Sequence, residues 1–120
     1  MRLREELRER TKQYAGAIIR SYVALPTSRR EVQVVGHQLL RSGTSVAAHV
    51  REASRARSDA EFCSKLDAAL QEADESVLWL ELLRDDCGIV TKELAHLLAE
   101  TDELMSIFAT MVGRTKRRNR

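Results

Sequence analysis

Three pairs of ionisable residues in this sequence have a spacing at which side chains on a helix can act together. Residues three apart share one helical face. The pairs are Glu93 with His96, His49 with Glu52, and Glu72 with Glu75. A Glu-x-x-His pair is the unit from which four-helix bundles build di-metal sites, and two carboxylates on one face can divide acid–base work between them.

A metal site of that kind needs more than this sequence contains. It requires Glu-x-x-His on two helices and a glutamate from each of the other two. The motif occurs once, at Glu93 and His96 in the first turn of a predicted helix, and in reversed order at His49 and Glu52. We therefore expect no metal and no cofactor.

The paired glutamates are not accompanied by a nucleophile. No glycine-rich phosphate loop, Cys-x-x-Cys motif or Ser-His-Asp set can be assembled from the sequence. We assign no catalytic residue and expect a protein that is not an enzyme. Glu72 directly precedes the predicted core position Ala73, and a buried carboxylate needs a partner, for which Arg41 or Arg51 is available. We predict a structural polar network of Arg41, Ser45, His49, Glu52, Glu72 and Glu75.

Charge is unevenly distributed along the 120 residues, although the net charge is only +2. Residues 1–57 carry 12 basic and 5 acidic side chains, a net +7; residues 58–113 carry 3 and 13, a net −10; residues 114–120 add +5. Such opposed halves can be neutralised within the chain, between subunits, or by an external polyanion.

Clustered basic residues are the strongest functional signal. The predicted nucleic-acid-binding residues are Arg51, Arg55, Arg57, Arg114, Lys116, Arg117, Arg118 and Arg120. The same terminal run also fits a solubilising end. Phosphate binding would depend steeply on salt. Aromatic residues make up only 4% of the chain, which argues against sequence-specific recognition of single strands by base stacking.

The elements that must position these residues are helical throughout. Apolar residues recur at steps of three, four or seven in four segments, residues 3–25, 28–56, 59–86 and 91–113. Thr27 or Ser28 can cap the second segment, Ser58 with Glu61 forms a capping box for the third, and Gly88 suits the left-handed position after it. Short connections favour an all-α, antiparallel up-down-up-down four-helix bundle in residues 1–113, followed by a flexible basic tail at 114–120.

The stretch "SGTS" interrupts the second segment with small residues. It lies between Leu39 and Val46, on the core side of the helix. Gly43 costs about 1 kcal/mol relative to Ala in a helix interior. We therefore interpret the stretch as a place where a neighbouring helix packs closely.

Two cysteines and the N-terminus bear on location. Cys63 and Cys87 lie near opposite ends of one predicted helix, about 36 Å apart at about 1.5 Å per residue, which is too far for a disulfide. The start "MRLREELRERTKQY" has no apolar signal region, and no segment reaches the length of a membrane span. We expect a cytoplasmic protein that does not enter a membrane.

Apolar residues exceed what a lone bundle buries. A helix in such a bundle needs an apolar stripe about 100° wide. The residues beyond that stripe, predicted to form an oligomer interface, are Val34, Leu40, Leu70, Trp79, Leu82 and Leu98. An exposed patch of this kind marks a contact between subunits.

The segment from Leu25 to Leu83 resembles a bacterial four-helix-bundle family encoded in intervening sequences of large-subunit ribosomal RNA genes, and a related branch, the accessory variability protein of diversity-generating retroelements. The family pattern is Q-L-x-R-[SA]-x-x-S-[IV]-x-A-N-x-x-E-[AG], then a short turn and a helix with E-[AS]-x-E and often W-L. The matching residues are Gln38, Leu39, Arg41, Ser42, Ser45, Val46, Ala48, Glu52, Ala53, Ser58, Phe62, Lys65, Leu66, Glu72, Ala73, Glu75, Trp79 and Leu80. His49 stands where the family usually has Asn.

The resemblance implies a four-helix bundle assembled as a ring-like homo-oligomer, most often a pentamer. It implies little about activity, except that the basic pentamer of the retroelement branch binds nucleic acid and acts with a reverse transcriptase. No residue assigns this chain to that branch. Two functions remain open: a non-enzymatic accessory protein that binds structured RNA or an RNA–DNA hybrid, and an interaction scaffold that docks a partner enzyme such as a reverse transcriptase, with its arginines in intersubunit salt bridges.

Overall fold

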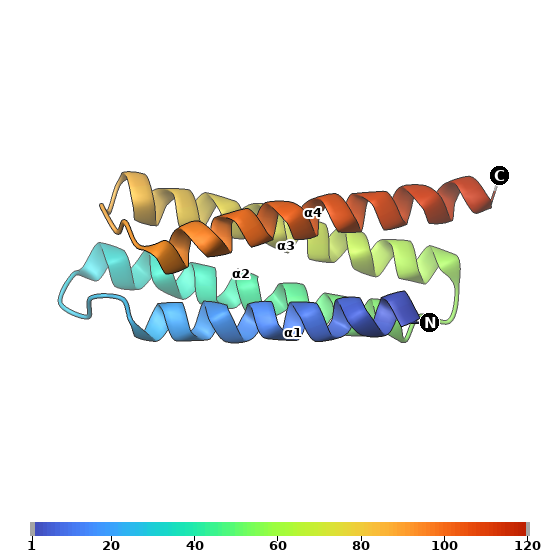
Figure 1. Ribbon diagram of the computed structural model, residues 1–120, viewed down its shortest axis with the longest axis horizontal. Helices are drawn as coiled ribbons and strands as arrows, with labels where there is room; N and C mark the ends of the chain where they lie inside the picture. Colours follow the sequence, from blue (N-terminus) through green and yellow to red (C-terminus); the bar gives the residue numbers. More distant parts are fainter. Residues whose placement is uncertain (1, 120) are drawn as a thin grey trace.

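A computed structural model describes residues 2–119 of the chain, and side chains from residue 4 onward. Within these residues there are four helices and no strand: α1 (Arg2–Val23), α2 (Arg30–Ser54), α3 (Asp59–Asp85) and α4 (Lys92–Arg118). The helices lie along one long axis of a body measuring 52 × 21 × 20 Å (Figure 1). This confirms the predicted all-α class.

The two ends of this body differ in what they contain. At one end lie the α1–α2 and α3–α4 connections, residues 24–29 and 86–91, which we call the loop end (Figure 1). At the other end lie the α2–α3 turn, residues 55–58, and the last residues of α4, 114–119; we call this the basic end. The start of α1 is also at the basic end (Figure 1).

The residue that caps α3 is the one predicted from the sequence, whereas the residue that caps α2 is not. The Ser58 hydroxyl accepts the Glu61 N–H at 3.1 Å, which confirms the predicted cap. The residue that caps α2 is Arg29, whose side chain makes no cap hydrogen bond, so the prediction of Thr27 or Ser28 was wrong. The Arg29 guanidinium instead donates to the Cys87 carbonyl at 2.9 Å and joins the two connections of the loop end.

In the connection from α3 to α4, Gly88 has the left-handed conformation that the sequence predicted. Gly88 has a φ of +72°, in the left-handed region that favours glycine. α4 then begins with Thr91, whose hydroxyl accepts the Leu94 N–H at 3.2 Å. Both cysteines of the chain, Cys63 and Cys87, are buried and free.

The C-terminal segment departs most from the sequence-based expectation. α4 continues to Arg118 instead of ending at 113, so the residues predicted to form a flexible tail are helical through that position. Val112 and Thr115 extend the buried seam of α4, and the Thr115 hydroxyl donates to the Met111 carbonyl at 2.8 Å. Basic side chains at a helix C-terminus also interact favourably with the helix dipole.

Gly43 marks a close approach of α1 to α2. A Cβ built on Gly43 would lie 2.8 to 3.0 Å from three side-chain carbons of Ile18, a separation that real Cβ atoms essentially never show. Both residues are buried. The interpretation of "SGTS" as a site of close helix packing is confirmed.

Hydroxyl groups from all four helices meet in the otherwise apolar core. The Tyr14 hydroxyl and Thr101 Oγ1 are 2.6 Å apart, and Ser42 Oγ and Ser76 Oγ are 2.7 Å apart. Burial raises the pKa of Tyr14, and hydrogen bonding from Thr101 and Ser76 opposes that rise. Because each helix contributes one member, this hydroxyl layer ties together the register of the whole bundle.

Candidate nucleic-acid interface

Three arginines converge at the α2–α3 turn. Arg51, on the last turns of α2, and Arg55 and Arg57, in the turn itself, are all exposed. They line a hollow of about 490 Å³ together with Ala48, Glu52 and Glu61. The end of α2 and the short turn thus bring three arginines to one hollow, and arginine side chains can bind phosphate with two parallel hydrogen bonds.

The two carboxylates of this hollow, Glu52 and Glu61, both have partners other than the three guanidinium groups. Glu52 contacts His49 Nδ1 at 3.0 Å and Lys65 Nζ at 3.3 Å. The hydrogen bond with His49, and to a lesser extent the one with Lys65, holds the pKa of Glu52 below its usual range. The Glu61 carboxylate accepts the backbone N–H of Arg57 at 3.3 Å.

No guanidinium of the hollow has a carboxylate partner. Within residues 4–119, none of Arg51, Arg55 and Arg57 takes part in an ion pair. The three positive charges therefore remain available to an external anion.

The last turns of α4 add a second basic group at the same end of the molecule. Arg114, Lys116, Arg117 and Arg118 are all exposed. Of these, Arg118 is pinned to Asp59 at 3.4 Å. Arg120, the remaining predicted member, lies outside the described residues.

Asp59 organises this end and was not predicted from the sequence. Asn119 Nδ2 donates to its carboxylate at 2.9 Å. This bond and the contact with Arg118 hold the pKa of Asp59 below its usual range. The only local signal was its place in the first turn of α3, where an acidic residue suits the helix dipole without any tertiary role.

The aromatic side chain at the basic end, Phe62, is not available to solvent. Phe62 is buried, and the Arg4 guanidinium lies 4.1 Å from the centre of its ring. No aromatic side chain among residues 4–119 is fully exposed. The interface therefore offers charge for a phosphate backbone and no stacking platform for bases.

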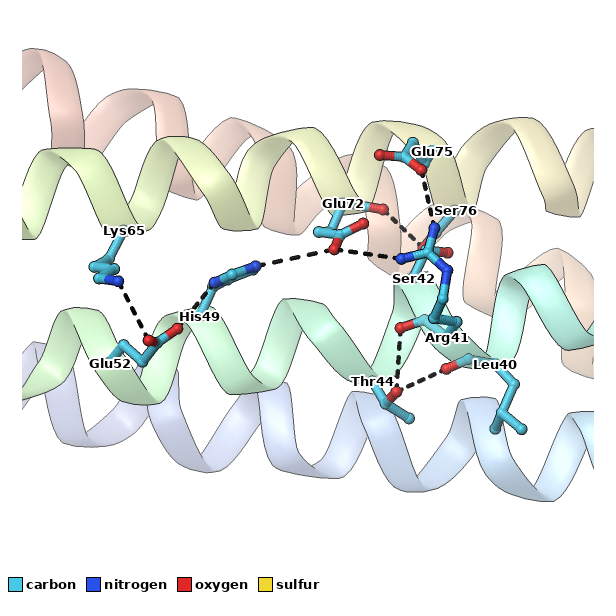
Figure 2. Close-up of polar contacts among 10 residues, drawn as sticks. All are labelled: Leu40, Arg41, Ser42, Thr44, His49, Glu52, Lys65, Glu72, Glu75 and Ser76. Atoms are coloured by element: carbon cyan, nitrogen blue, oxygen red, sulfur yellow. Dashed lines mark hydrogen bonds and ion pairs between the residues drawn. The ribbon is translucent and has the colours of Figure 1, made fainter.

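The predicted polar network lies on the neighbouring surface of α2 and α3 (Figure 2). Arg41 Nη2 lies 3.4 Å from Glu75 Oε1, and Arg41 Nη1 lies 3.9 Å from Glu72 Oε2. His49 connects the two halves, at 3.0 Å from Glu52 and 3.9 Å from Glu72. Arg41 is thus the partner of Glu72, at the long end of ion-pair distances.

The membership of this network differs from the prediction at two residues, Ser45 and Lys65. The Ser45 side chain forms no hydrogen bond within the described residues, whereas Lys65 joins the network through Glu52. Glu72 Oε1 is buried without a hydrogen-bond partner. The hydroxyl of Ser42 points instead to Ser76 in the core (Figure 2).

The predicted oligomer-interface residues are mostly covered within the subunit. Leu40, Leu70, Trp79 and Leu98 are half-buried against the core, and Leu82 is half-buried as well. Val34 alone of the six is exposed, at 53%. Five of the six are thus partly covered by neighbouring helices of the same subunit, and the oligomer interface formed by all six stays a prediction.

The described residues contain neither a cluster of metal ligands nor a membrane-spanning helix. No three His, Cys, Asp or Glu side chains of this part of the chain lie close enough to share a metal ion. Glu93 and His96 are exposed at the start of α4. None of the helices in residues 2–119 combines the length and hydropathy of a bilayer-spanning segment.

Comparison with known proteins agrees with the four-helix fold. A protein with unknown function from the S23 ribosomal protein family of Bacteroides thetaiotaomicron VPI-5482, with a crystal structure at 1.70 Å, is 32% identical in sequence. The similarity covers 88% of this chain and 97% of that one, with a TM-score of 0.79. No curated protein matches. The sequence profile of the family described as "23S rRNA-intervening sequence protein" matches residues 5–110, and the chain belongs to this family.

Proposed function

We propose that the chain is a non-enzymatic accessory protein that binds structured RNA, or an RNA–DNA hybrid, through phosphates. It acts as an antiparallel up-down-up-down bundle assembled in a ring-like homo-oligomer, with five subunits as the family resemblance implies. The observation that carries the proposal is the basic end. Arg51, Arg55 and Arg57 are exposed there and have no carboxylate partner among the described residues, and the basic last turns of α4 lie at the same end.

The chemistry of this end supports backbone contacts more than base contacts. Guanidinium groups match phosphate geometry, and phosphate contacts carry no sequence information. In a ring, each basic end is repeated, so weak contacts combine into high avidity. No cofactor is needed for such binding. We place the protein in the cytoplasm because both cysteines are free thiols.

A matched pair of double variants tests the proposal. Arg51→Ala with Arg55→Ala removes two charges from the hollow; Lys12→Ala with Arg30→Ala removes two exposed charges elsewhere. Binding to a structured RNA is measured by fluorescence anisotropy at several salt concentrations. The first variant should bind at least about tenfold more weakly, with a salt slope that is shallower by about one unit for each phosphate it no longer neutralises. An equal loss in both variants would mean that only net charge matters, and would overturn the site.

A second candidate function rests on the acidic surface of α3. Residues 58–113 carry a net charge of −10, which can neutralise the basic half of a neighbouring subunit. The ring would then be a scaffold that docks a partner enzyme such as a reverse transcriptase, with the arginines in intersubunit pairs. Charge reversal by Arg51→Glu or Arg55→Glu should dissociate the oligomer in this case. A ring that survives the reversal, measured by light scattering, excludes this use of the arginines.

A further inference from the structure

A groove runs between the first and last helices near the loop end. α1 and α4 make the slightest contact of the neighbouring helix pairs, and between them lies a groove of about 1000 Å³. Tyr14 and Ala17 line it from α1, Leu25 from the connection that follows α1, and Leu94 and Leu97 from α4. The floor of the groove is therefore apolar, whereas charged and polar side chains of α1 and α4 line its edges. Ala17 on α1 leaves room for an inserted side chain.

The rim of the groove carries uncommitted positive charge at the loop end. Arg20 and Lys92 line it and are exposed, and neither forms an ion pair within the described residues. Lys92 occupies the first turn of α4, where the helix dipole disfavours a cation. Glu93 on the same turn offsets one of these two charges, so an excess of positive charge remains.

At its other end the groove is closed by an internal ion pair. Arg10 of α1 contacts Glu100 at 2.7 Å and Glu103 at 3.1 Å. The hydrogen bond to Glu100, and to a lesser extent the one to Glu103, raises the pKa of Arg10. Its single positive charge is thus outweighed by two carboxylates, and the unpaired cations that line the groove lie toward the loop end.

The outer face of α3 has the complementary chemistry. Leu78 is 47% exposed, and Asp74 and Glu81 flank it at four and three residues. Asp67 continues the same stripe, because positions seven apart return to one face of a helix. Neither Asp67 nor Asp74 forms an ion pair within residues 4–119, and Glu81 acts only on nearby Arg84. We call residues 67, 74, 78 and 81 the acidic stripe.

Length and location also match. The acidic stripe extends over residues 67–81, about 21 Å at about 1.5 Å per residue. The side of the groove formed by α1 and the residue after it, from Arg10 to Ala24, covers a similar length. Every large hydrophobic residue that the described chain exposes lies in the half of the molecule toward the loop end. These residues are Ile19, Val23, Val34, Leu78 and Val90. The apolar surface is thus separated from the basic end.

We propose that the groove between α1 and α4 receives the acidic stripe of a second copy of this chain. Leu78 of the second copy enters the apolar floor, and its carboxylates meet Arg20 and Lys92. Because groove and stripe are different surfaces of one chain, the contact is head-to-tail, and repetition generates a closed ring or a filament. This inference rests on the proposed homo-oligomer and adds which surfaces meet.

Two variants, each with one surface destroyed, test the pairing. Arg20→Glu with Lys92→Glu makes the groove acidic and leaves the stripe intact. Leu78→Asp puts a carboxylate where the apolar contact is made and leaves the groove intact. All three residues are exposed, so both variants should fold, which circular dichroism checks. Light scattering without nucleic acid should show wild-type protein as an oligomer and each variant alone as a 13.6 kDa monomer.

The decisive measurement is an equimolar mixture of the two variants. One intact groove and one intact stripe should form a single contact, so the mixture should have twice the mass of the chain and stop there. Val34→Asp, at the one predicted interface residue that is exposed, should leave the wild-type mass unchanged.

Each contrary result has a distinct meaning. A monomeric wild type would overturn the ring and this inference together. An oligomeric wild type whose variants stay oligomeric, or whose mixture stays monomeric, would overturn the pairing of these surfaces and leave the ring standing. RNA binding is measured separately on the Arg51 and Arg55 variants, so failure at the basic end is read independently of failure at the groove.

Discussion

Asn119, one residue beyond the end of α4, donates a hydrogen bond of 2.9 Å to Asp59 in the first turn of α3. Arg118 reaches the same carboxylate at 3.4 Å. A residue 60 positions earlier in the chain thereby holds the C-terminal turn of α4 against the start of α3.

Removing this anchor should release the end of α4. Asp59→Ala is expected to lower hydrogen-exchange protection of the amides of residues 115–118, because the turn loses its polar contacts with α3. Asp102→Ala, which removes an exposed carboxylate that makes no ion pair within the described residues, should leave this protection unchanged. Equal protection in wild type and Asp59→Ala would show that the turn is stable by itself.

The contact of the Asp59 carboxylate with Asn119 and Arg118 should depend on pH. The pKa of Asp59 is lowered by Asn119 first and Arg118 second. A group with a depressed folded-state pKa stabilises the fold above its unfolded pKa, about 3.9, and this contribution disappears as the pH falls through the folded value. Exchange protection of residues 115–118 should therefore drop below about pH 4 in wild type, and show no such step in Asp59→Ala.

The buried serine pair should behave as one unit. Ser42→Ala or Ser76→Ala leaves a hydroxyl without its 2.7 Å partner in the core, at an expected cost of about 1–2 kcal/mol in the free energy of unfolding. The double substitution should cost less than the sum of the two, as measured by urea unfolding in a double-mutant cycle. Ser106→Ala, at an exposed position, is the control. Strict additivity would contradict a direct bond.

Two glycines in helices should respond in opposite ways to alanine. Gly43→Ala gains helix propensity, yet its Cβ meets Ile18 at 2.8 Å, so we expect net destabilisation by about 1–2 kcal/mol. At Gly113 the nearest group is the flexible Arg117 guanidinium at 3.3 Å, and alanine should stabilise by about 0.5–1 kcal/mol. Thermal unfolding compares the two, and Ile18→Val should partly rescue Gly43→Ala.

His49 stands where the family usually has Asn, and the pKa of Glu52 should change when His49 is replaced by Asn. His49 is the largest cause of the depressed pKa of Glu52, and Lys65 is the second. His49→Asn should raise the pKa of Glu52 more than Lys65→Met does, measured by NMR titration of the side-chain carboxyl carbon. The reverse order would place the main contact at Lys65.

The amino-acid sequence determined the local features of this protein. Periodic apolar residues set four helices, Ser58 sets the start of α3, Gly88 sets the turn after it, and Gly43 marks a close approach. The helices, the cap and the turn depend on backbone propensity or on neighbours within a turn or two of the chain. Gly43 differs, because a glycine in an apolar stripe indicates that some neighbour is close without saying which one. All four features can therefore be predicted from composition and spacing. That Glu72 has a basic partner on α2 was predictable too, because a nearly buried carboxylate needs one, but the choice of Arg41 over Arg51 came from the structure.

The tertiary structure decided what lies beside what. It brought the arginines of the α2–α3 turn and the last turns of α4 to one end, anchored those turns on Asp59, and set four hydroxyls in one layer. It also left α1 and α4 apart as the walls of a groove. Spacing shows which face of a helix is apolar, but the rotation and axial position of each helix come from packing all four together, and those two quantities place residues from distant segments in contact.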